Sequence, residues 1–472
     1  MSQVLSEKKN FAKKGYFTEN KHVSLPSFLE KYVELFKVYR RNNTDKAYAY
    51  ILGLMKCEKN HTNMERMVEQ VPEQAYHQYH NFLSESKWDY KAVNKQTALD
   101  VSTLMEGCKS RSGKPTGFII DESVHLKKGK ESVGVARQYA GVSGKVDNCQ
   151  VAVYGSLCNE ENAALIDTAL FLPEKWTENK NRCDKAGIPK SEYVFETKPQ
   201  KALRMIRANL KLGVKFDWIG GDGLYGHNTE LTRGLDAENL FYVLDVHKDE
   251  LIYLAEPTFS IPPKKGNRGA NPTKEKADKP ALRIDEYFGN LIESQWDRVK
   301  IRKTAKGWKY VWVHTVAVWH WDGKEEKART RTLVITRTEE KNPKVKFSFS
   351  NGGITEYNRE EYAYFQCNRY WVERCFDDAK NELGLSGYQV RKWIAWQHHQ
   401  SLVMMAALYV LSIRIAQKPE YELMSVRDAR IMIIAQLFDD QETISRLHDQ
   451  MALRHKNRQR DINRFYKDIN DS

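Results

Sequence analysis

Two aspartates in this sequence each follow a short apolar run that predicts a β-strand. Asp121 follows such a run in TGFIIDES, and Asp222 closes WIGGD before a glycine-rich bend. An aspartate in this position is most often a turn former or a helix N-cap, and that is the simplest interpretation of Asp222 taken alone. Open α/β sheets, however, bind ligands beyond the carboxyl ends of their strands. We therefore expect these two strand-end carboxylates to lie side by side at one sheet edge.

A third carboxylate, Glu373, lies in RYWVERCFDDAK, whose apolar residues predict a helix with one packed face. At about 3.6 residues per turn, Arg369, one turn before it, and Lys380, two turns after it, fall near the same helix face. Such a row is by default an ion-pair ladder on a solvated helix. Beside two strand-end aspartates we interpret Glu373 as a metal ligand, with Arg369 and Lys380 holding DNA phosphates.

Three converging carboxylates repel one another unless cations lie between them. Oxygen ligands of this kind select Mg²⁺, with Mn²⁺ as the alternative. A pair of such ions stabilises the attacking and leaving oxygens of an in-line displacement at phosphorus. The expected catalytic and metal-binding residues are therefore Asp121, Asp222 and Glu373, and the expected chemistry is cleavage or transfer at a phosphodiester.

The charge of the chain favours a polyanionic partner. Its 472 residues include 75 lysines and arginines against 62 aspartates and glutamates, giving a net charge of +13 and a pI near 9.1. Nucleic acid is the commonest large polyanion in a cytosol. The stretch HLKKGKESVGVARQY, directly after Asp121, is either a solvated loop or a phosphate-binding loop beside the metal site. We favour the second, and the predicted DNA contacts are Lys127, Lys128, Lys130, Arg137, Arg369 and Lys380.

The elements that would position these residues form a mixed α/β arrangement. Apolar spacing predicts helices before residue 113, then strands alternating with helices, which implies a mixed sheet with helices on both faces. A Pro-, Gly- and Lys-rich linker and several β-rich segments interrupt this pattern. We predict an N-terminal helical DNA-binding domain (1–112), a first part of the core (113–250), a linker with a β-rich insertion (251–355), the rest of the core (356–416) and a basic helical tail (417–472).

Several other features have ordinary structural interpretations. The insertion's tryptophans are expected to pack a small β unit, although one at its edge could stack on a flipped-out base. Three histidines, His247, His398 and His399, lack metal-ligand spacing, so core or capping roles are expected. The seven cysteines never form Cys-x-x-Cys and should be free thiols, mostly buried. We find no apolar run long enough for a bilayer and no signal peptide, so a cytosolic protein is expected.

These stretches resemble the DDE transposases of bacterial insertion sequences, specifically the insertion sequence 701 group within the insertion sequence four-like superfamily. The first-aspartate block, IIDESVHLKKGKESVGVARQYAGVSGKVDNCQVAV, is the most specific match, joined by WIGGDGLYG and RYWVERCFDDAKNELGLSGYQVRKWIAWQHH. The resemblance implies a ribonuclease H-like core interrupted by a β-rich insertion. Arg369, Glu373 and Lys380 fit the superfamily signature Tyr-x2-Arg-x3-Glu-x6-Lys, whereas Gln366 replaces its tyrosine.

The expected function is a DNA transposase that cuts transposon ends and joins the freed 3′-hydroxyl to target DNA by two-metal in-line transfer. Its expected partners are terminal inverted repeats and target DNA, held by a homodimer in a synaptic complex, in the cytoplasm on the bacterial nucleoid. Two alternatives stay open: a metal-dependent nuclease without strand transfer, and a non-catalytic DNA-binding protein derived from a transposase.

Overall fold

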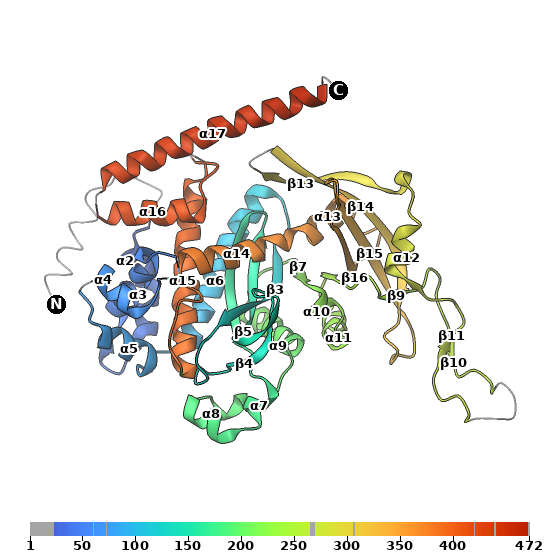
Figure 1. Cartoon of the computed structure of the whole chain (residues 1–472), viewed down its shortest axis with the longest axis horizontal. Coiled ribbons are helices and arrows are strands. Elements are labelled where there is room, and N and C mark those ends of the chain that lie inside the picture. The colour runs from blue at the N-terminus through green and yellow to red at the C-terminus, as the bar shows by residue number, and fades with distance from the viewer. Residues whose placement is uncertain are drawn as a thin grey trace.

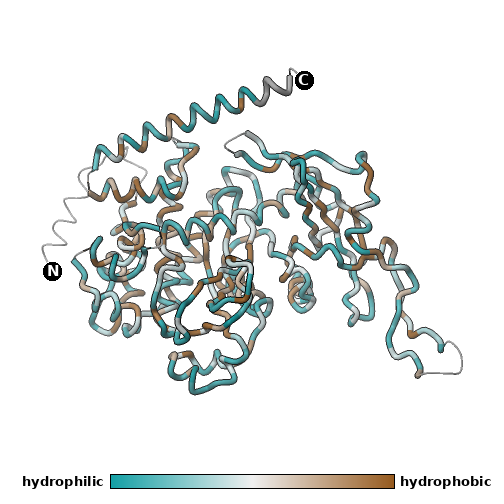
Figure 2. The backbone as a smooth tube through the Cα atoms, in the orientation of Figure 1, coloured by the Kyte–Doolittle hydropathy of each residue, from teal (hydrophilic) through white to brown (hydrophobic). Residues whose placement is uncertain are grey.

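The computed structural model describes residues 23–470 apart from 60, 72, 265–269, 305–306, 420 and 439, and the side chains only as far as residue 464. The N-terminal stretch considered above for a signal peptide lies outside this range. Figure 1 shows three regions along the long axis: N-terminal helices, a central sheet with its helices, and the inserted strands, with one long C-terminal helix above them. Figure 2 shows that this last helix and the extended hairpin of the insertion are mainly hydrophilic.

The N-terminal region is helical, as the apolar spacing predicts. Its longest helix, α6, begins after Asp89, whose carboxylate accepts hydrogen bonds from the amides of Lys91 and Ala92, and it ends at Gly113. Gly113 has φ of 68°, a left-handed conformation that glycine adopts without strain. The elements of this region are α2 (Leu25–Leu29), η1 (Glu30–Phe36), β1 (Lys37–Val38), β2 (Arg41–Asn42), α3 (Thr44–Lys56), α4 (Met64–Gln70), α5 (Tyr76–Ser84) and α6 (Tyr90–Ser112).

The central sheet has the strand order β6-β5-β3-β7-β8. Strand β5 runs antiparallel to both β3 and β6, whereas β3, β7 and β8 are parallel. This order and these directions are those of the ribonuclease H-like fold, as expected. The strands are β3 (Gly117–Leu126), β4 (Ala136–Ala140), β5 (Lys145–Asn159), β6 (Asn162–Leu170), β7 (Trp218–Gly221) and β8 (Tyr242–Asp245).

Helices cover both faces of this sheet, which confirms the predicted mixed α/β arrangement. Gly155 on β5 packs so closely against Met205 of α9 that an added Cβ would lie 2.9 Å from its sulfur. The neighbouring residue, Tyr154, faces the other side and packs edge to face against Phe376 of α14 (Tyr370–Glu382). The helices between the core strands are α7 (Glu174–Thr177), α8 (Lys180–Ala186), η2 (Lys190–Glu192), α9 (Lys198–Leu212), α10 (Gly223–Gly226) and α11 (Thr229–Ala237).

The insertion extends the same sheet. Strand β16 pairs antiparallel with β8, and β15, β14 and β13 follow in order. A separate apolar cluster that includes Ile252, Trp296 and Phe349 packs this region. Its elements are β9 (Leu251–Ile252), β10 (Phe259–Ser260), β11 (Lys276–Ala277), β12 (Leu282–Arg283), α12 (Ile284–Gly289), η3 (Glu293–Gln295), β13 (Asp297–Thr304), β14 (Gly307–His320), β15 (Arg329–Thr338) and β16 (Val345–Ser350).

The helix expected around Glu373 is divided at Arg369, which caps the end of one helix and the start of the next. The expectation of a single helix was therefore wrong. Two more helices and the long basic tail helix follow. The C-terminal elements are α13 (Arg359–Asn368), α14 (Tyr370–Glu382), α15 (Trp393–Gln417), α16 (Val426–Leu437) and α17 (Gln441–Asn470).

Helix α15 corrects one expectation from the sequence. By length and composition it is apolar enough to cross a membrane, which we did not expect of any segment. In the fold, 72% of its most apolar window is buried inside the protein. It packs against α6, α3 and β6, as the core helix of a globular domain does.

One hydrophobic core joins the N-terminal helices to the central sheet. Leu54 of α3, Phe118 of β3 and Met404 of α15 belong to the same cluster of buried residues. This core runs across the predicted boundaries. The five-part division of the chain stays a prediction. One strand carries only a weak signal in the sequence: β6 is rich in alanine, a weak strand former.

Candidate active site

The backbone register brings three aspartates into one row. Ile120 on β3 pairs with Gly221 on β7, and Gly221 pairs with Leu244 on β8. The next residue of each strand is an aspartate: Asp121, Asp222 and Asp245. Asp121 does not end its strand as expected, since β3 continues to Leu126, but it lies immediately beyond the part of β3 that pairs with β7. Two of these aspartates were predicted to lie together, and the structure places them so.

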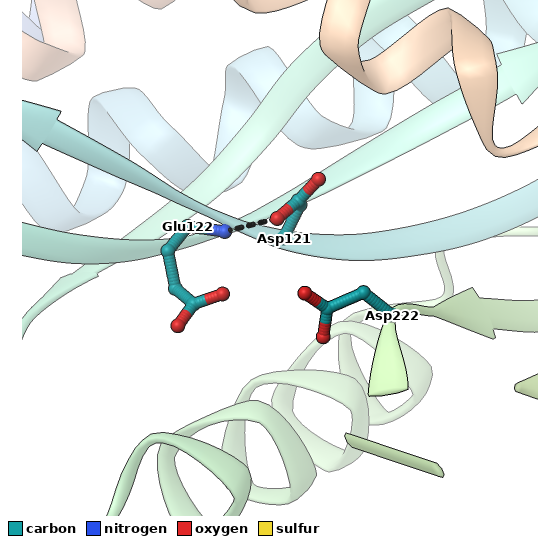
Figure 3. A group of neighbouring side chains, drawn as sticks. All are labelled: Asp121, Glu122 and Asp222. Carbon is teal, nitrogen blue, oxygen red and sulfur yellow. Dashed lines mark hydrogen bonds between the residues drawn. The ribbon is translucent and has the colours of Figure 1, made fainter. Parts of the chain in front are cut away.

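The carboxylates of Asp121, Glu122 and Asp222 converge. One oxygen atom from each lies within 4.8 Å of the other two (Figure 3). Asp121 and Glu122 are consecutive on β3, so their side chains leave opposite faces of the strand. Asp222 follows the end of β7 and can approach both, and Figure 3 shows its carboxylate pointing towards Glu122. The backbone amide of Glu122 donates a hydrogen bond of 2.7 Å to Asp121 Oδ1, which orients that carboxylate.

Asp222 is also a helix cap, so the simplest interpretation of its position is correct in part. It precedes α10, and its Oδ1 accepts a hydrogen bond of 3.0 Å from the amide of Leu224. This bond uses one carboxylate oxygen and fixes the rotamer. The cap and the acidic cluster are therefore compatible, because capping holds the side chain at the point where the other carboxylates meet.

Glu122 is anchored from the opposite side by α9. Its Oε1 accepts a hydrogen bond of 2.6 Å from Lys198 Nζ, and both side chains are largely buried. The buried Tyr225 hydroxyl belongs to the same surroundings, and burial together with the nearby carboxylates raises the pKa of that tyrosine. Burial also raises the pKa of Glu122, while the Lys198 ammonium opposes the shift.

Arg369 connects the predicted glutamate to the cluster. Its Nη1 lies 3.3 Å from Asp121 Oδ2, and its Nη2 lies 3.1 Å from Glu373 Oε1. Its Nε lies 3.1 Å from Asp245 Oδ2. Glu373, in the first turn of α14, is 51% exposed and is not part of the group of carboxylates within 4.8 Å. The structure therefore brings Asp121 and Asp222 together and links Glu373 to them through the guanidinium.

The charge balance of this site is negative. Asp121, Glu122, Asp222, Asp245 and Glu373 are the carboxylates of the site. In the described part of the chain the cations in direct ion pairs with them are Lys198 and Arg369. Burial raises the pKa of Asp121 to about 7, and the charges of Asp222 and Glu122 add to the rise, against the effect of Arg369. A buried group of oxygen ligands with excess negative charge fits a hard divalent cation such as Mg²⁺ or Mn²⁺.

The predicted phosphate-binding residues fall into two groups. Lys380 lies near the site: burial lowers its pKa, and Asp377 and Asp121 act against that shift. The loop after β3 lies further away, because six strand residues at about 3.3 Å each place Lys127 about 20 Å along the chain from Asp121. The structure therefore does not place this loop beside the carboxylates as expected.

Within that loop Lys127 differs from its neighbours. Its ammonium lies 3.6 Å from the ring centroid of Tyr388 and donates a hydrogen bond of 2.9 Å to the Tyr388 carbonyl oxygen. Burial lowers its pKa to about 8. Lys128 and Lys130 are exposed. Arg137, on β4, is exposed as well, and its guanidinium donates a hydrogen bond of 3.4 Å to the Val146 carbonyl oxygen. Lys127 is engaged in contacts inside the protein, whereas the other three could contact a phosphate.

Two residues of the site were missed by reasoning from the sequence. Asp245 follows the apolar run FYVL, the same pattern that pointed to Asp121 and Asp222, so the signal was present. Glu122 carried a weaker signal. A residue next to Asp121 on a strand is expected to point away from it, and only the position of Asp222 beyond β7 brings the two faces together.

Most residues with ordinary expected roles behave as predicted, but His247 is exposed beside His227, with 5.8 Å between the ring centroids, so the core role expected for it was wrong. His398 and His399 are fully buried and bond to backbone carbonyl oxygens of Leu83 and Gly384. All seven cysteines are free, and all but Cys367 are buried. Most of the insertion's tryptophans are half-buried within their β unit, whereas Trp308 is 36% exposed beside Lys300, whose Nζ lies 3.5 Å from its ring centroid.

Comparison with known proteins gives a consistent result. Residues 33–308, more than half of the chain, match a family model described as DDE superfamily endonuclease. A probable transposase for insertion sequence element IS701 from Microchaete diplosiphon is 32% identical over 176 residues. That match covers 37% of this chain and 41% of the relative, so it spans about two fifths of the relative's length.

A solved structure, a piggyBac transposase synaptic complex with hairpin DNA, overlaps 90% of this chain and 80% of its own chain. The identity is 10% and the TM-score is 0.40. This TM-score is too low to establish a shared fold. The strand order and directions of the central sheet support the ribonuclease H-like assignment independently of it.

Proposed function

The chain belongs to the DDE superfamily of endonucleases, and from this membership we propose that it is a DNA transposase that cleaves transposon ends and joins them to target DNA. The observation that carries the proposal is the convergence of Asp121 and Asp222 on one edge of a ribonuclease H-like sheet. The 32% identity to a probable insertion-sequence transposase supports the same conclusion.

Asp121 and Asp222 are the proposed metal-binding and catalytic aspartates, with Glu373 as the third carboxylate. Bound Mg²⁺ or Mn²⁺ ions would supply activation of the attacking oxygen and stabilisation of the leaving oxygen in an in-line displacement at phosphorus. The cap at the amide of Leu224 holds the Asp222 carboxylate in place before any ligand arrives. A catalytic group requires this preorganisation, since no reorganisation is then needed at the moment of reaction.

Glu373 would complete the site by a short movement. Its contact with Arg369 is an i,i+4 ion pair in which Arg369 is largely buried and Glu373 is half exposed. Solvent around the exposed carboxylate weakens this attraction. Half of its surface is open, so its side chain is free to change rotamer. The buried start of α14, where Val372 packs in the core, fixes the backbone from which that side chain extends. The backbone of Glu373 is therefore held in place, while its carboxylate is free to move.

DNA is the proposed partner, held by basic residues beside the carboxylates and by others beyond the end of β3. Arg369 and Lys380 are proposed to contact phosphates near the cleaved bond, and Lys128, Lys130 and Arg137 to contact the duplex further along. About 20 Å corresponds to about six base pairs of B-form DNA, at about 3.4 Å per pair, so one bound duplex would reach both groups. We further propose that the N-terminal helices contact terminal repeats and that a homodimer holds two ends together in the cytoplasm, on the nucleoid.

The test is cleavage of DNA that carries the repeats flanking the protein's own gene, in the presence of Mg²⁺. Asp222→Asn should keep the cap to Leu224, because asparagine caps helices as well as aspartate does. It should bind the DNA like wild type and lose at least about a hundredfold in cleavage rate. The matched control is Asp217→Asn at the opposite end of β7, where Asp217 accepts a hydrogen bond from the amide of Thr116.

Each alternative predicts a different result. A nuclease without strand transfer would cleave the repeat ends but fail to join pre-cleaved ends to a target plasmid. If the protein is a non-catalytic DNA-binding protein, both wild type and Asp222→Asn would bind the repeats, and neither would cut them. Equal cleavage by wild type and Asp222→Asn would show that Asp222 is only a helix cap.

A further inference from the structure

Asp245 lies in the row of aspartates but outside the cluster of three carboxylates. Both of its oxygens are already engaged: Oδ1 accepts a hydrogen bond of 2.7 Å from Ser348 Oγ, and Oδ2 accepts one of 3.1 Å from Arg369 Nε. Its side chain is 16% exposed. A carboxylate used in this way binds its neighbours in the protein and has little capacity left for a metal ion.

The contact with Ser348 joins Asp245 to the insertion. Ser348 lies on β16, directly opposite Asp245 in the pairing of β16 with β8. Its Oγ accepts a hydrogen bond of 2.7 Å from Gln366 Nε2 on α13, and that Nε2 also donates to the Val334 carbonyl oxygen at 3.2 Å. Ser348 and Gln366 are fully buried. A continuous chain of hydrogen bonds therefore runs from the inserted strands through Asp245 to Arg369.

Arg369 lies at the end of this chain with three anionic partners. Its Nε faces Asp245, its Nη1 faces Asp121 and its Nη2 faces Glu373. Two of these partners belong to the proposed metal site, and Asp245 does not. The contact with Asp245 therefore determines how strongly the guanidinium attracts the carboxylates of Asp121 and Glu373.

We propose that Asp245 is a positioning residue that holds Arg369 beside, and not over, the metal-binding carboxylates, with Ser348 of the insertion fixing Asp245 in turn. The inference rests on the proposed function, since it concerns the metal site proposed there. Without the Asp245 charge, the guanidinium is neutralised only by Asp121 and Glu373. It then competes with a divalent cation for those two groups.

The experiment is calorimetric titration of the DNA-free, full-length protein with Mn²⁺ alone. Asp245→Asn should weaken Mn²⁺ binding by about tenfold, as expected for one uncompensated charge at a short distance in a partly buried site. The matched control is Asp236→Asn. Asp236 is equally buried and lies 2.6 Å from both Arg329 and Arg331, so its loss disturbs the fold in a similar way away from the carboxylates.

Two further variants separate positioning from a direct loss of charge. Asp245→Asn removes a negative charge near the site whether or not Arg369 is present. The change in the free energy of Mn²⁺ binding caused by Asp245→Asn should be less than half as large in Arg369→Gln protein as in protein that keeps Arg369. The reason is that the residue through which Asp245 acts is gone. Ser348→Ala should weaken Mn²⁺ binding in the same direction by about twofold to threefold, since it removes one hydrogen bond that holds Asp245.

The outcomes are distinguishable. Wild-type protein that binds no Mn²⁺ would overturn the proposed metal site and this inference together. Wild-type binding with an unchanged Asp245→Asn affinity, or with a loss equal to that of Asp236→Asn, would overturn the inference alone. The inference would also be overturned if Asp245→Asn changed Mn²⁺ affinity equally with Arg369 present and in Arg369→Gln protein. That result would mean that Asp245 acts only by its own charge. A lowered melting temperature with unchanged Mn²⁺ affinity would leave Asp245 a purely structural role.

Discussion

Arg369 Nη1 lies 3.3 Å from Asp121 Oδ2, so this largely buried carboxylate has a cationic neighbour. The charges of Asp222 and Glu122 act on the same carboxylate in the opposite sense. Burial outweighs the attraction to Arg369, and the net result is a pKa for Asp121 of about 7. Its ordinary value is 3.8, so this one group couples folding to pH between about pH 4 and about pH 7.

The free energy of unfolding of the metal-free protein should fall as pH rises from about 5 to about 7. A raised pKa means that folded Asp121 binds a proton where the unfolded chain has released it. The contribution is lost as pH rises through the folded pKa, with a slope of up to about 1.4 kcal/mol per pH unit. Urea unfolding in EDTA at several pH values should show this slope in wild type and a flatter curve in Asp121→Asn.

The difference between the pH curves of wild type and Asp121→Asn gives the contribution of Asp121 to the pH dependence of stability. Asp167 and Asp378 are buried carboxyls whose pKa is also raised, in both cases to about 6, and they contribute equally to wild type and variant. Added Mg²⁺ should stabilise wild type more at pH 8 than at pH 6, because metal and proton compete for the same oxygens. Identical pH curves for wild type and Asp121→Asn would contradict the prediction.

Glu122→Gln should raise the Mg²⁺ concentration needed for half-maximal cleavage by about tenfold, with a smaller change at saturating metal. The reason is that Glu122 adds charge to the site while Asp121 and Asp222 stay in place. The matched control is Glu196→Gln near the start of α9, where Glu196 pairs with Lys201 at 3.1 Å and Arg204 at 2.8 Å. If Glu122→Gln needs no more metal than wild type, Glu122 only anchors α9 through Lys198.

The basic loop after β3 gives a contrast between adjacent lysines. Lys128→Ala with Lys130→Ala should weaken DNA binding and reduce the slope of log affinity against log salt by about 2, that is, by about 1 for each phosphate that the protein no longer neutralises. Stability should stay within about 0.5 kcal/mol of wild type because both side chains are exposed. Fluorescence anisotropy at several salt concentrations measures the slope.

Lys127→Met is the control for that pair. It should leave the salt slope unchanged, because the Lys127 ammonium is held inside the protein at the Tyr388 ring and the Tyr388 carbonyl oxygen. A double alanine variant that follows the wild-type salt dependence would remove the loop from the DNA-binding surface.

The sequence was sufficient to predict the main elements of the core and the meeting of two aspartates. The runs before Asp121 and Asp222 are short, apolar and bounded by turn residues, and such runs pair in the centre of a sheet. Parallel strands then align their carboxyl ends, so the juxtaposition follows from topology. The same reasoning applied to the run before Asp245 would have completed the row.

The remaining features depend on side-chain packing that spacing does not encode. Lys127 and Lys128 are identical in sequence terms, yet only Lys127 lies over Tyr388, a residue 261 positions away in the chain. Gln366 departs from the signature tyrosine, and its reason is visible only in the fold: its amide bonds to Ser348 and to the Val334 carbonyl oxygen inside the sheet. The division of the Glu373 helix at Arg369 likewise has no marker such as proline or glycine.

The pairing of β16 with β8 has a mechanical consequence. The insertion is joined to the catalytic sheet by backbone hydrogen bonds along Ser348–Ser350, and not by a hinge alone. It cannot swing as a free arm unless those bonds break. Anything bound to the insertion would therefore lie at a fixed spacing from the row of aspartates, set by the paired strands between them.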